Sequence, residues 1–146
     1  MVFKKVLLAY DESADSQKAS EWLLNFAKQI PVETVVANVF DSIFENDADS
    51  WAKIQDAVEA YRQKMEDALT TVANTFSANG LKATTVILEG HPAFQIIQYA
   101  VGEHVDLIVC GSRGRGGFES LLVGSVAHQL VSHSPVPIVV IKSDLK

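Results

Sequence analysis

The sequence predicts an α/β fold in which a single doubly wound parallel sheet of five strands carries helices on both faces. Five short apolar segments, each suited to a strand buried on both faces, alternate with four segments of helical spacing. Such alternation is typical of parallel strands joined by helical crossovers. A length of 146 residues with 48% apolar residues suits one compact domain over residues 1–146.

The first half of the chain supplies two strands and two helices. A strand at 6–9 leads to Asp11, and a helix follows that begins at Ser13 or Asp15 as N-cap and stops at Pro31. A second strand at 34–40, an acidic loop at 41–50 and a long helix at 54–76 come next, and the turn residues Asn79 and Gly80 end that helix.

The second half repeats the pattern. Strands are expected at 83–88, 105–110 and 136–141. After the first of these strands a helix is predicted through the apolar residues Phe94, Ile97 and Val101. A short helix with the apolar residues Val126, Ala127, Leu130 and Val131 is predicted before the last strand.

Composition narrows the classes of function. A formal net charge of -6 argues against a nucleic-acid or anionic-membrane surface, because both need a basic face. The one cysteine, Cys110, cannot form an internal disulfide, and we expect it to be an inert buried thiol. The first residues run into a strand pattern without a signal peptide, and no apolar run is long enough to span a bilayer, so the cytoplasm is the expected compartment.

Two loops contain the residues that suggest chemistry. The first strand is followed by Tyr10, Asp11, Glu12 and Ser13, and the fourth is followed by the glycine-rich segment 111–117. In open α/β sheets ligands bind beyond the carboxyl ends of the strands, where the strand order reverses. If both loops border one site, the first and fourth strands are neighbours, and the order is 3-2-1-4-5.

The glycine-rich segment predicts a phosphate site. Five of the eight glycines lie from Gly111 to Gly124, and glycine permits positive φ and close approach to a ligand. Gly124 and Ser125 stand where the last helix begins, so its free amides and dipole favour an anion. Arg113 and Arg115 are the only lysine or arginine residues between Lys82 and Lys142, and they could clamp phosphates. The alternative is a solvated loop that needs glycine only to turn.

The spacing Gly111, two residues, Gly114, nine residues, Gly124-Ser125 resembles the nucleotide-binding motif of the ATP-binding branch of the universal stress protein family. The resemblance extends along the chain, through Ala9-Tyr10-Asp11, Ala37-Asn38-Val39, Gly90-His91-Pro92-Ala93, the segment 106–109 and the segment 134–140. Two positions depart from the family pattern. Tyr10 is bulkier than the small or β-branched residue that is usual in the family, and Asn38 stands where the family frequently has histidine.

The resemblance implies a Rossmann-like fold of the adenine nucleotide alpha hydrolase type and a regulatory protein that binds ATP, or ADP or AMP, with Mg²⁺ carried by the phosphates. Asp11 and the main chain near Ala9 and Val39 would hold the adenosine, Gly111 and Gly114 would line the ribose and phosphates, and Gly124 with Ser125 would anchor the phosphates. The candidate nucleotide-binding residues are Ala9, Tyr10, Asp11, Val39, Cys110, Gly111, Ser112, Arg113, Gly114, Arg115, Gly124, Ser125 and Val126.

An enzyme that hydrolyses ATP slowly or phosphorylates itself is the alternative, with Ser112, Ser120 or Ser125 as the nearest hydroxyls. Phosphoryl transfer needs metal ligands, a cation and a residue that orients the nucleophile. The Gly-Lys-Ser/Thr sequence of P-loop enzymes does not occur, and we assign no catalytic residue. The four histidines lack metal-ligand spacing, so we assign no protein-bound metal.

Assembly is predicted from the strand order. The last strand, 136–141, is then an edge of the sheet, and it has no charged residue before Lys142. Pairing with the same strand of a second molecule would satisfy its backbone groups, and the family resemblance implies the same edge. We therefore expect a homodimer and protein partners that the sequence does not identify.

Overall fold

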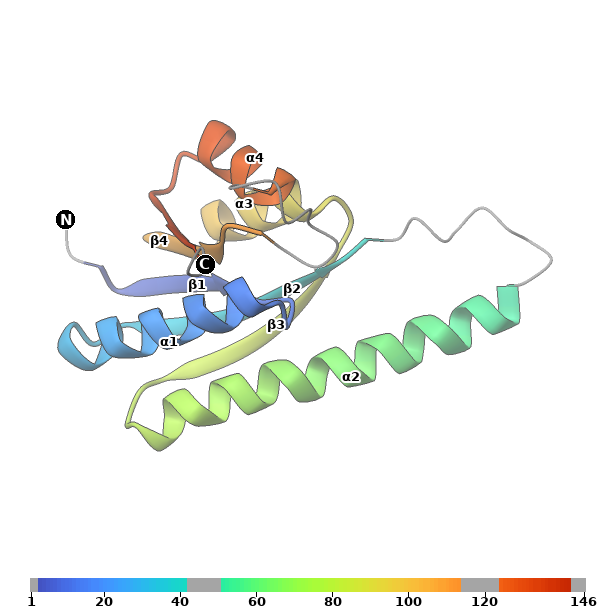
Figure 1. The fold of residues 1–146 in the computed structure, drawn as a ribbon, viewed down its shortest axis with the longest axis horizontal. Helices are drawn as coiled ribbons and strands as arrows, with labels where there is room; N and C mark the ends of the chain where they lie inside the picture. Colours follow the sequence, from blue (N-terminus) through green and yellow to red (C-terminus); the bar gives the residue numbers. More distant parts are fainter. Residues whose placement is uncertain (1–2, 42–50, 114–123, 143–146) are drawn as a thin grey trace.

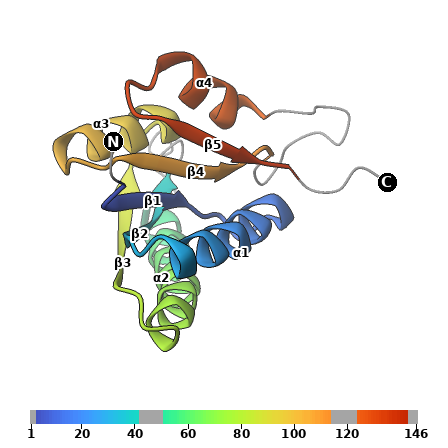
Figure 2. The same cartoon turned by 90° about the vertical axis from the view of Figure 1, so that its left-hand side faces the viewer.

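Five parallel strands form the centre of the part of the chain that the computed structural model describes, which is residues 3–41, 51–113 and 124–142. Their order is β3-β2-β1-β4-β5, which confirms the predicted order (Figure 2). Every neighbouring pair is parallel. The strands are β1 (Lys5–Ala9), β2 (Glu33–Phe40), β3 (Ala83–Glu89), β4 (Leu107–Gly111) and β5 (Ile138–Ile141).

Helices cover both faces of the sheet, as predicted. α1 (Ala14–Gln29) and α2 (Trp51–Ala78) lie on one face, and α3 (Pro92–Gly102) and α4 (Ser125–His133) lie on the other (Figure 1). Each face has its own core, because strand side chains alternate between the two sides. In β1, Leu8 packs with the α1 and α2 cluster, whereas Leu7 packs with the α3 and α4 cluster, and both side chains are fully buried.

Local sequence signals set where the helices begin and end. Ser13 is the N-cap of α1, and its Oγ accepts a hydrogen bond of 3.2 Å from the Ser16 amide, so Ser13 and not Asp15 caps the helix. α2 is followed by Gly80 at φ 77, a left-handed conformation that glycine adopts without a Cβ clash. Gly90, at φ 126, makes the turn into α3, which begins at Pro92.

Of the three apolar residues through which α3 was predicted, only Ile97 packs against the core. Phe94 and Val101 are 54% and 51% exposed, and the buried residues are Ala93, Ile96 and Ala100. Both stripes of this helix are apolar, and the small alanines allow the helix to approach the sheet more closely than a phenylalanine would. Val131 of α4 is likewise 59% exposed, whereas Ala127 and Leu130 are buried as expected.

Two strands are shorter than the apolar runs that predicted them. β4 begins at Leu107 and not at residue 105, and the carboxylate of Asp106 just before it accepts hydrogen bonds from the amides of Lys4 and Lys5, at 2.8 and 3.0 Å. β5 begins at Ile138 and not at residue 136, directly after Pro137, which has no N–H for a ladder.

Candidate functional site

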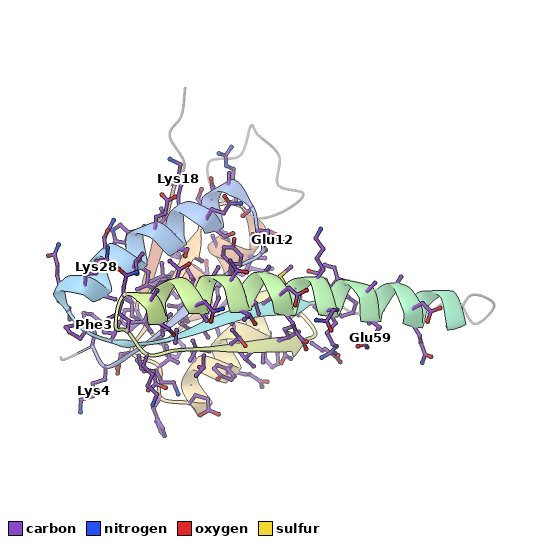
Figure 3. The ribbon with its side chains drawn as sticks, turned by 90° about the horizontal axis from the view of Figure 1, so that it is seen from below. Phe3, Lys4, Glu12, Lys18, Lys28 and Glu59 are labelled. Carbon is purple, nitrogen blue, oxygen red and sulfur yellow. The ribbon has the colours of Figure 1, made fainter. Side chains whose placement is uncertain are left out.

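A pocket of about 390 Å³ lies at the carboxyl ends of β1, β2 and β4. In Figure 3 the labelled residue Glu12, which follows β1, marks this end of the molecule. Phe3 and Lys4 mark the amino end of the same strand. The volume is within the range of small-molecule sites, roughly 300 to 1,000 Å³. The lining residues are Ala9, Tyr10, Asp11, Ser13, Ser16, Ala37, Asn38, Val39, Tyr61, Pro92, Ile96, Cys110, Gly111, Ser112, Arg113, Gly124, Ser125, Val126 and Ala127.

Every candidate residue that the structure describes lines this one pocket, although the residues come from segments far apart in the sequence. Gly114 and Arg115 lie outside the described residues. The lining contributed by Ser16, Ala37, Tyr61 and Ile96 was not predicted. These are ordinary helix and strand residues, and only their position in the fold brings them to the pocket.

One wall of the pocket is a backbone edge at Val39. The Phe40 carbonyl accepts a hydrogen bond from the Gly90 amide, just after β3, and the Ala37 carbonyl accepts one from the Tyr10 amide, just after β1. Successive residues of β2 therefore direct their backbone groups alternately toward β3 and toward β1. The N–H and C=O of Val39 therefore face the β1 side. The β1–β2 ladder ends at the pair Ala9–Ala37, which places Val39 beyond it. The N–H donor and the C=O acceptor of a single residue thus lie at the pocket.

Asn38 closes the end of the β1–β2 pairing with its side chain. Its Nδ2 donates to the Tyr10 carbonyl at 3.0 Å, a position that Val39 N–H would take in a continued ladder. This bond sets the orientation of the carboxamide, since the Tyr10 carbonyl can only accept. The residue is 5% exposed, and its Oδ1 has no partner among the described residues. The sequence indicates Asn38 as part of the segment Ala37-Asn38-Val39 and as a position where the family frequently has histidine, and it does not predict this hydrogen bond.

Asp11 makes a local hydrogen bond at the start of α1 and also lines the pocket. Its Oδ1 accepts from the Ser13 amide at 3.0 Å, the local bond of a helix-flanking aspartate, and the residue also lines the pocket. Ser13 caps α1 and donates from its hydroxyl to the Arg113 carbonyl at 3.4 Å. Glu12 between them adopts φ 67, which is uncommon for a residue with a side chain.

The start of α4 also lines the pocket. Gly124 is its N-cap, and Ser125 is its first residue. The amides of the first turn have no partner within the helix and lie at the positive end of its dipole. Gly124 donates its own N–H to the Ser112 carbonyl at 2.5 Å, which attaches the start of α4 to the end of β4.

The positive φ expected of the glycines in this segment is absent at Gly111 and Gly124, the two that the structure describes. Gly124 has φ -75, which any residue can adopt, and Gly111 has no positive φ either. Gly111 is required by packing, because a Cβ there would lie 2.7 Å from the carbonyl carbon and Cβ of Asp15 and 2.8 Å from the Ser16 amide nitrogen. The end of β4 therefore rests directly on the first turn of α1.

Asp15 is the main residue near the site that the sequence patterns did not reveal, since they indicated it only as a possible helix cap. Its side chain is 3% exposed. Its Oδ2 accepts from Ser112 Oγ at 2.7 Å, from the Arg113 amide at 3.0 Å and from Arg113 Nε at 3.4 Å. Arg113, which we expected as a phosphate clamp, therefore lines the pocket while pairing with a buried carboxylate.

Burial shifts the pKa of two groups at the pocket. It raises the pKa of the Cys110 thiol to about 12, because a thiolate would be desolvated there. Burial also raises the pKa of the Tyr10 phenol, and the nearby carboxylates of Glu12 and Asp11 add to the effect. At neutral pH both groups are uncharged, so neither supplies charge to a ligand.

Residues 3–41, 51–113 and 124–142 lack two further features. No group of three or more histidine, cysteine, aspartate or glutamate residues in this part is placed to hold a metal ion. None of the helices within it has the length and apolar character that crossing a membrane requires.

The chain matches the model of the universal stress protein family over residues 2–142. A universal stress protein of Methanocaldococcus jannaschii is 32% identical over 99% of this chain and 85% of its own length. Among solved structures, a universal stress protein of Lactobacillus plantarum aligns with a TM-score of 0.89 and 23% identity over 97% of this chain and 99% of its own. The likeness to this structure covers the whole fold.

A further solved structure contains a ligand. It is the universal stress protein of Archaeoglobus fulgidus in complex with dAMP, which aligns with a TM-score of 0.68 and 18% identity over 97% of this chain and 100% of its own. A protein with the same fold therefore binds an adenine nucleotide.

Proposed function

This chain belongs to the universal stress protein family, and on that premise we propose that it binds an adenine nucleotide, ATP in preference to ADP and AMP, in the pocket between β1, β2 and α4. It acts as a regulatory binding module whose bound and free states differ in surface. A cytoplasmic location and protein partners of unknown identity remain predictions from the sequence.

The observation that carries the proposal is the position of two complementary backbone sites in one pocket. At one wall, Val39 offers an N–H donor and a C=O acceptor. The edge of adenine has an amino donor beside a ring-nitrogen acceptor, so the two match, whereas guanine presents the opposite order. At the other wall, the first turn of α4 offers amides and a positive dipole end to phosphates.

The residues present fit a Mg²⁺ ion that arrives with the phosphates. The hydroxyl of Ser125 borders the pocket at the start of α4, where we expect the phosphates, and an oxygen ligand of this kind suits Mg²⁺. The ion would neutralise phosphate charge, while the chain would supply the base edge and the helix start.

Slow ATP hydrolysis or self-phosphorylation stays the alternative, and the structure makes Ser112 a poor acceptor for it. Ser112 is 1% exposed, and its Oγ donates a hydrogen bond of 2.7 Å to Oδ2 of Asp15. Ser125 is exposed at the start of α4, and Ser120 lies outside the described residues.

Calorimetric titration tests the proposal, with ATP, ADP, AMP and GTP each added with and without Mg²⁺. We expect ATP to bind at least about tenfold more tightly than GTP, a difference of roughly 1.4 kcal/mol. Mass spectrometry of nucleotide released from the purified protein would identify the species retained. A site with a binding free energy of only about 4.1 kcal/mol is half filled at a ligand concentration of about 1 mM. The proposal is overturned if no adenine nucleotide binds at that concentration.

The expected homodimer is proposed on the edge formed by β5. Within the described residues β5 pairs only with β4, and the Pro137 and Ile141 carbonyls accept bonds from the β4 side. The N–H and C=O groups of Ile138 and Val140 therefore point outward from the sheet. The same strand of a second copy, related by a twofold axis, would pair with them.

A further inference from the structure

We propose that Asp15 is a positioning residue for phosphate binding: its buried carboxylate holds the end of β4, and through Ser112 the start of α4, in the geometry that the phosphates require. The inference rests on the proposed nucleotide binding and deepens it. Asp15 does not line the pocket, so it acts through other residues and not on the ligand.

The first step is that Asp15 is a charge with a specific task. Its side chain is 3% exposed, and a single oxygen, Oδ2, accepts from Ser112 Oγ, the Arg113 amide and Arg113 Nε. Bonds to an ionised acceptor are stronger and more directional than those between neutral groups. Asp15 also lies in the first turn of α1, where the helix dipole stabilises a negative charge.

The second step is that Ser112 joins three elements. Its hydroxyl donates to Asp15 of α1, its N–H donates to the Ile141 carbonyl of β5 at 2.8 Å, and its carbonyl accepts from the Gly124 amide at 2.5 Å. Gly124 is the N-cap of α4. The bonds from Asp15 to Ser112 and from Ser112 to Gly124 therefore connect the N-terminal ends of α1 and α4.

The third step is that Gly111 fixes the same junction by packing. Because Gly111 has no Cβ, the end of β4 lies directly on the backbone of Asp15. The helix start that would bind phosphates is thus located by the α1 side of the sheet, although α4 itself packs on the opposite face. The adenine edge at Val39 belongs to β2 and is not part of this linkage.

Asp15 is thus linked to the expected phosphate site and not to the adenine edge, so a ligand with phosphates and one without them can be compared. Replacing Asp15 by asparagine keeps the shape and removes the charge that orders the three donors. We expect the ATP affinity of Asp15→Asn to fall by roughly tenfold or more, whereas the adenosine affinity stays within about twofold of the wild-type value. A general loss of structure would weaken both ligands together, so the ratio of the two affinities separates positioning from folding.

Asp106→Asn is the matched control. Asp106 also accepts two hydrogen bonds on one carboxylate oxygen, but from the amides of Lys4 and Lys5 at the amino ends of the strands. We expect it to leave the ratio of ATP to adenosine affinity unchanged. Ser112→Ala serves as a second variant, and it should lower ATP affinity selectively while adding little to Asp15→Asn in the double variant, because both act in one linkage.

Titrations of ATP and of adenosine, followed by calorimetry and by NMR for the weaker ligand, measure the two affinities. A selective loss of ATP in Asp15→Asn, or in Ser112→Ala if the first variant does not fold, supports the positioning role. Equal losses of both ligands, or unchanged ATP affinity in a folded variant, would overturn it. A wild-type protein that binds neither ligand would overturn the proposed function itself.

Discussion

Gly111 and Asp15 are in direct backbone contact: a Cβ on Gly111 would lie 2.7 Å from both the carbonyl carbon and the Cβ of Asp15. These atoms belong to the first turn of a helix and cannot move away as the tip of a flexible side chain could. Packing in the fold therefore requires Gly111, the first residue of the glycine-rich segment, whether or not a ligand binds.

Gly111→Ala is accordingly expected to lower the free energy of unfolding by about 1–3 kcal/mol, as overpacking does in a well-packed core. Urea unfolding measures the change. Gly102→Ala is the matched control, because a Cβ at Gly102 of α3 would have nothing within 4 Å, and we expect it to be neutral or slightly stabilising. Equal stability of the two variants would contradict the packing argument.

Gly124→Val is expected to abolish measurable ATP binding while the protein stays folded. Its φ of -75 suits valine, so the fold tolerates the change apart from a modest loss of capping. The added side chain would stand at the N-terminus of α4, where phosphates would approach the amides. Calorimetry measures binding, and circular dichroism checks the fold. We predict the same outcome for Gly114→Val, from the sequence motif alone.

Arg113→Ala should weaken ATP binding less than Gly124→Val, because amides hold a fixed geometry and a side-chain cation is screened. The loss should shrink further as salt is added. Lys82→Ala is the control, since Lys82 lies just before β3, at the opposite end of the sheet from the pocket. A loss in Arg113→Ala equal to that of Gly124→Val would indicate a site that is mainly electrostatic.

Cys110 should react slowly with Ellman's reagent in the native protein. Burial raises the pKa of its thiol from 9.0 to about 12, so almost no thiolate exists at a pH of about 8. The pKa of the thiol is higher in the folded protein than in the unfolded chain. The stability that comes from keeping this thiol protonated is therefore complete below pH 9.0. It is lost as the pH rises from 9.0 toward about 12, because the thiol then ionises in the unfolded chain and not in the folded protein. Urea-denatured protein is the control, and equal rates before and after denaturation would refute the prediction.

Val140→Pro should disrupt the proposed dimer and leave the monomer fold intact. The N–H of Val140 points away from β4, and an edge strand tolerates proline where its N–H faces outward. Sedimentation equilibrium measures the change of mass, with Val140→Thr as the control that keeps the N–H. A wild-type chain that is monomeric at tens of micromolar, or a dimer that the proline leaves unchanged, would show that β5 is not the interface.

Residue patterns were sufficient to predict the fold class, the strand order and the segments that meet at the pocket. Apolar runs such as 6–9 report burial on both faces, and parallel connections restrict where their carboxyl ends lie. The unusual residues after the first and fourth strands then indicated that β1 and β4 are neighbours, as they are. Apolar runs depend on neighbouring residues, and the positions of the strand ends depend on how parallel strands connect. Both can therefore be predicted from the sequence.

Packing in three dimensions was needed to establish which of two apolar stripes of α3 is buried, and what Asp15 and Gly111 do. Ala93, Ile96 and Ala100 form the buried stripe although Phe94 and Val101 are large and apolar, because the space between helix and sheet selects side chains by size. Asp15 and Ser112 are 97 positions apart in the chain. No periodicity or motif encodes such a pair, since the bond between them exists only after α1 and β4 have packed together.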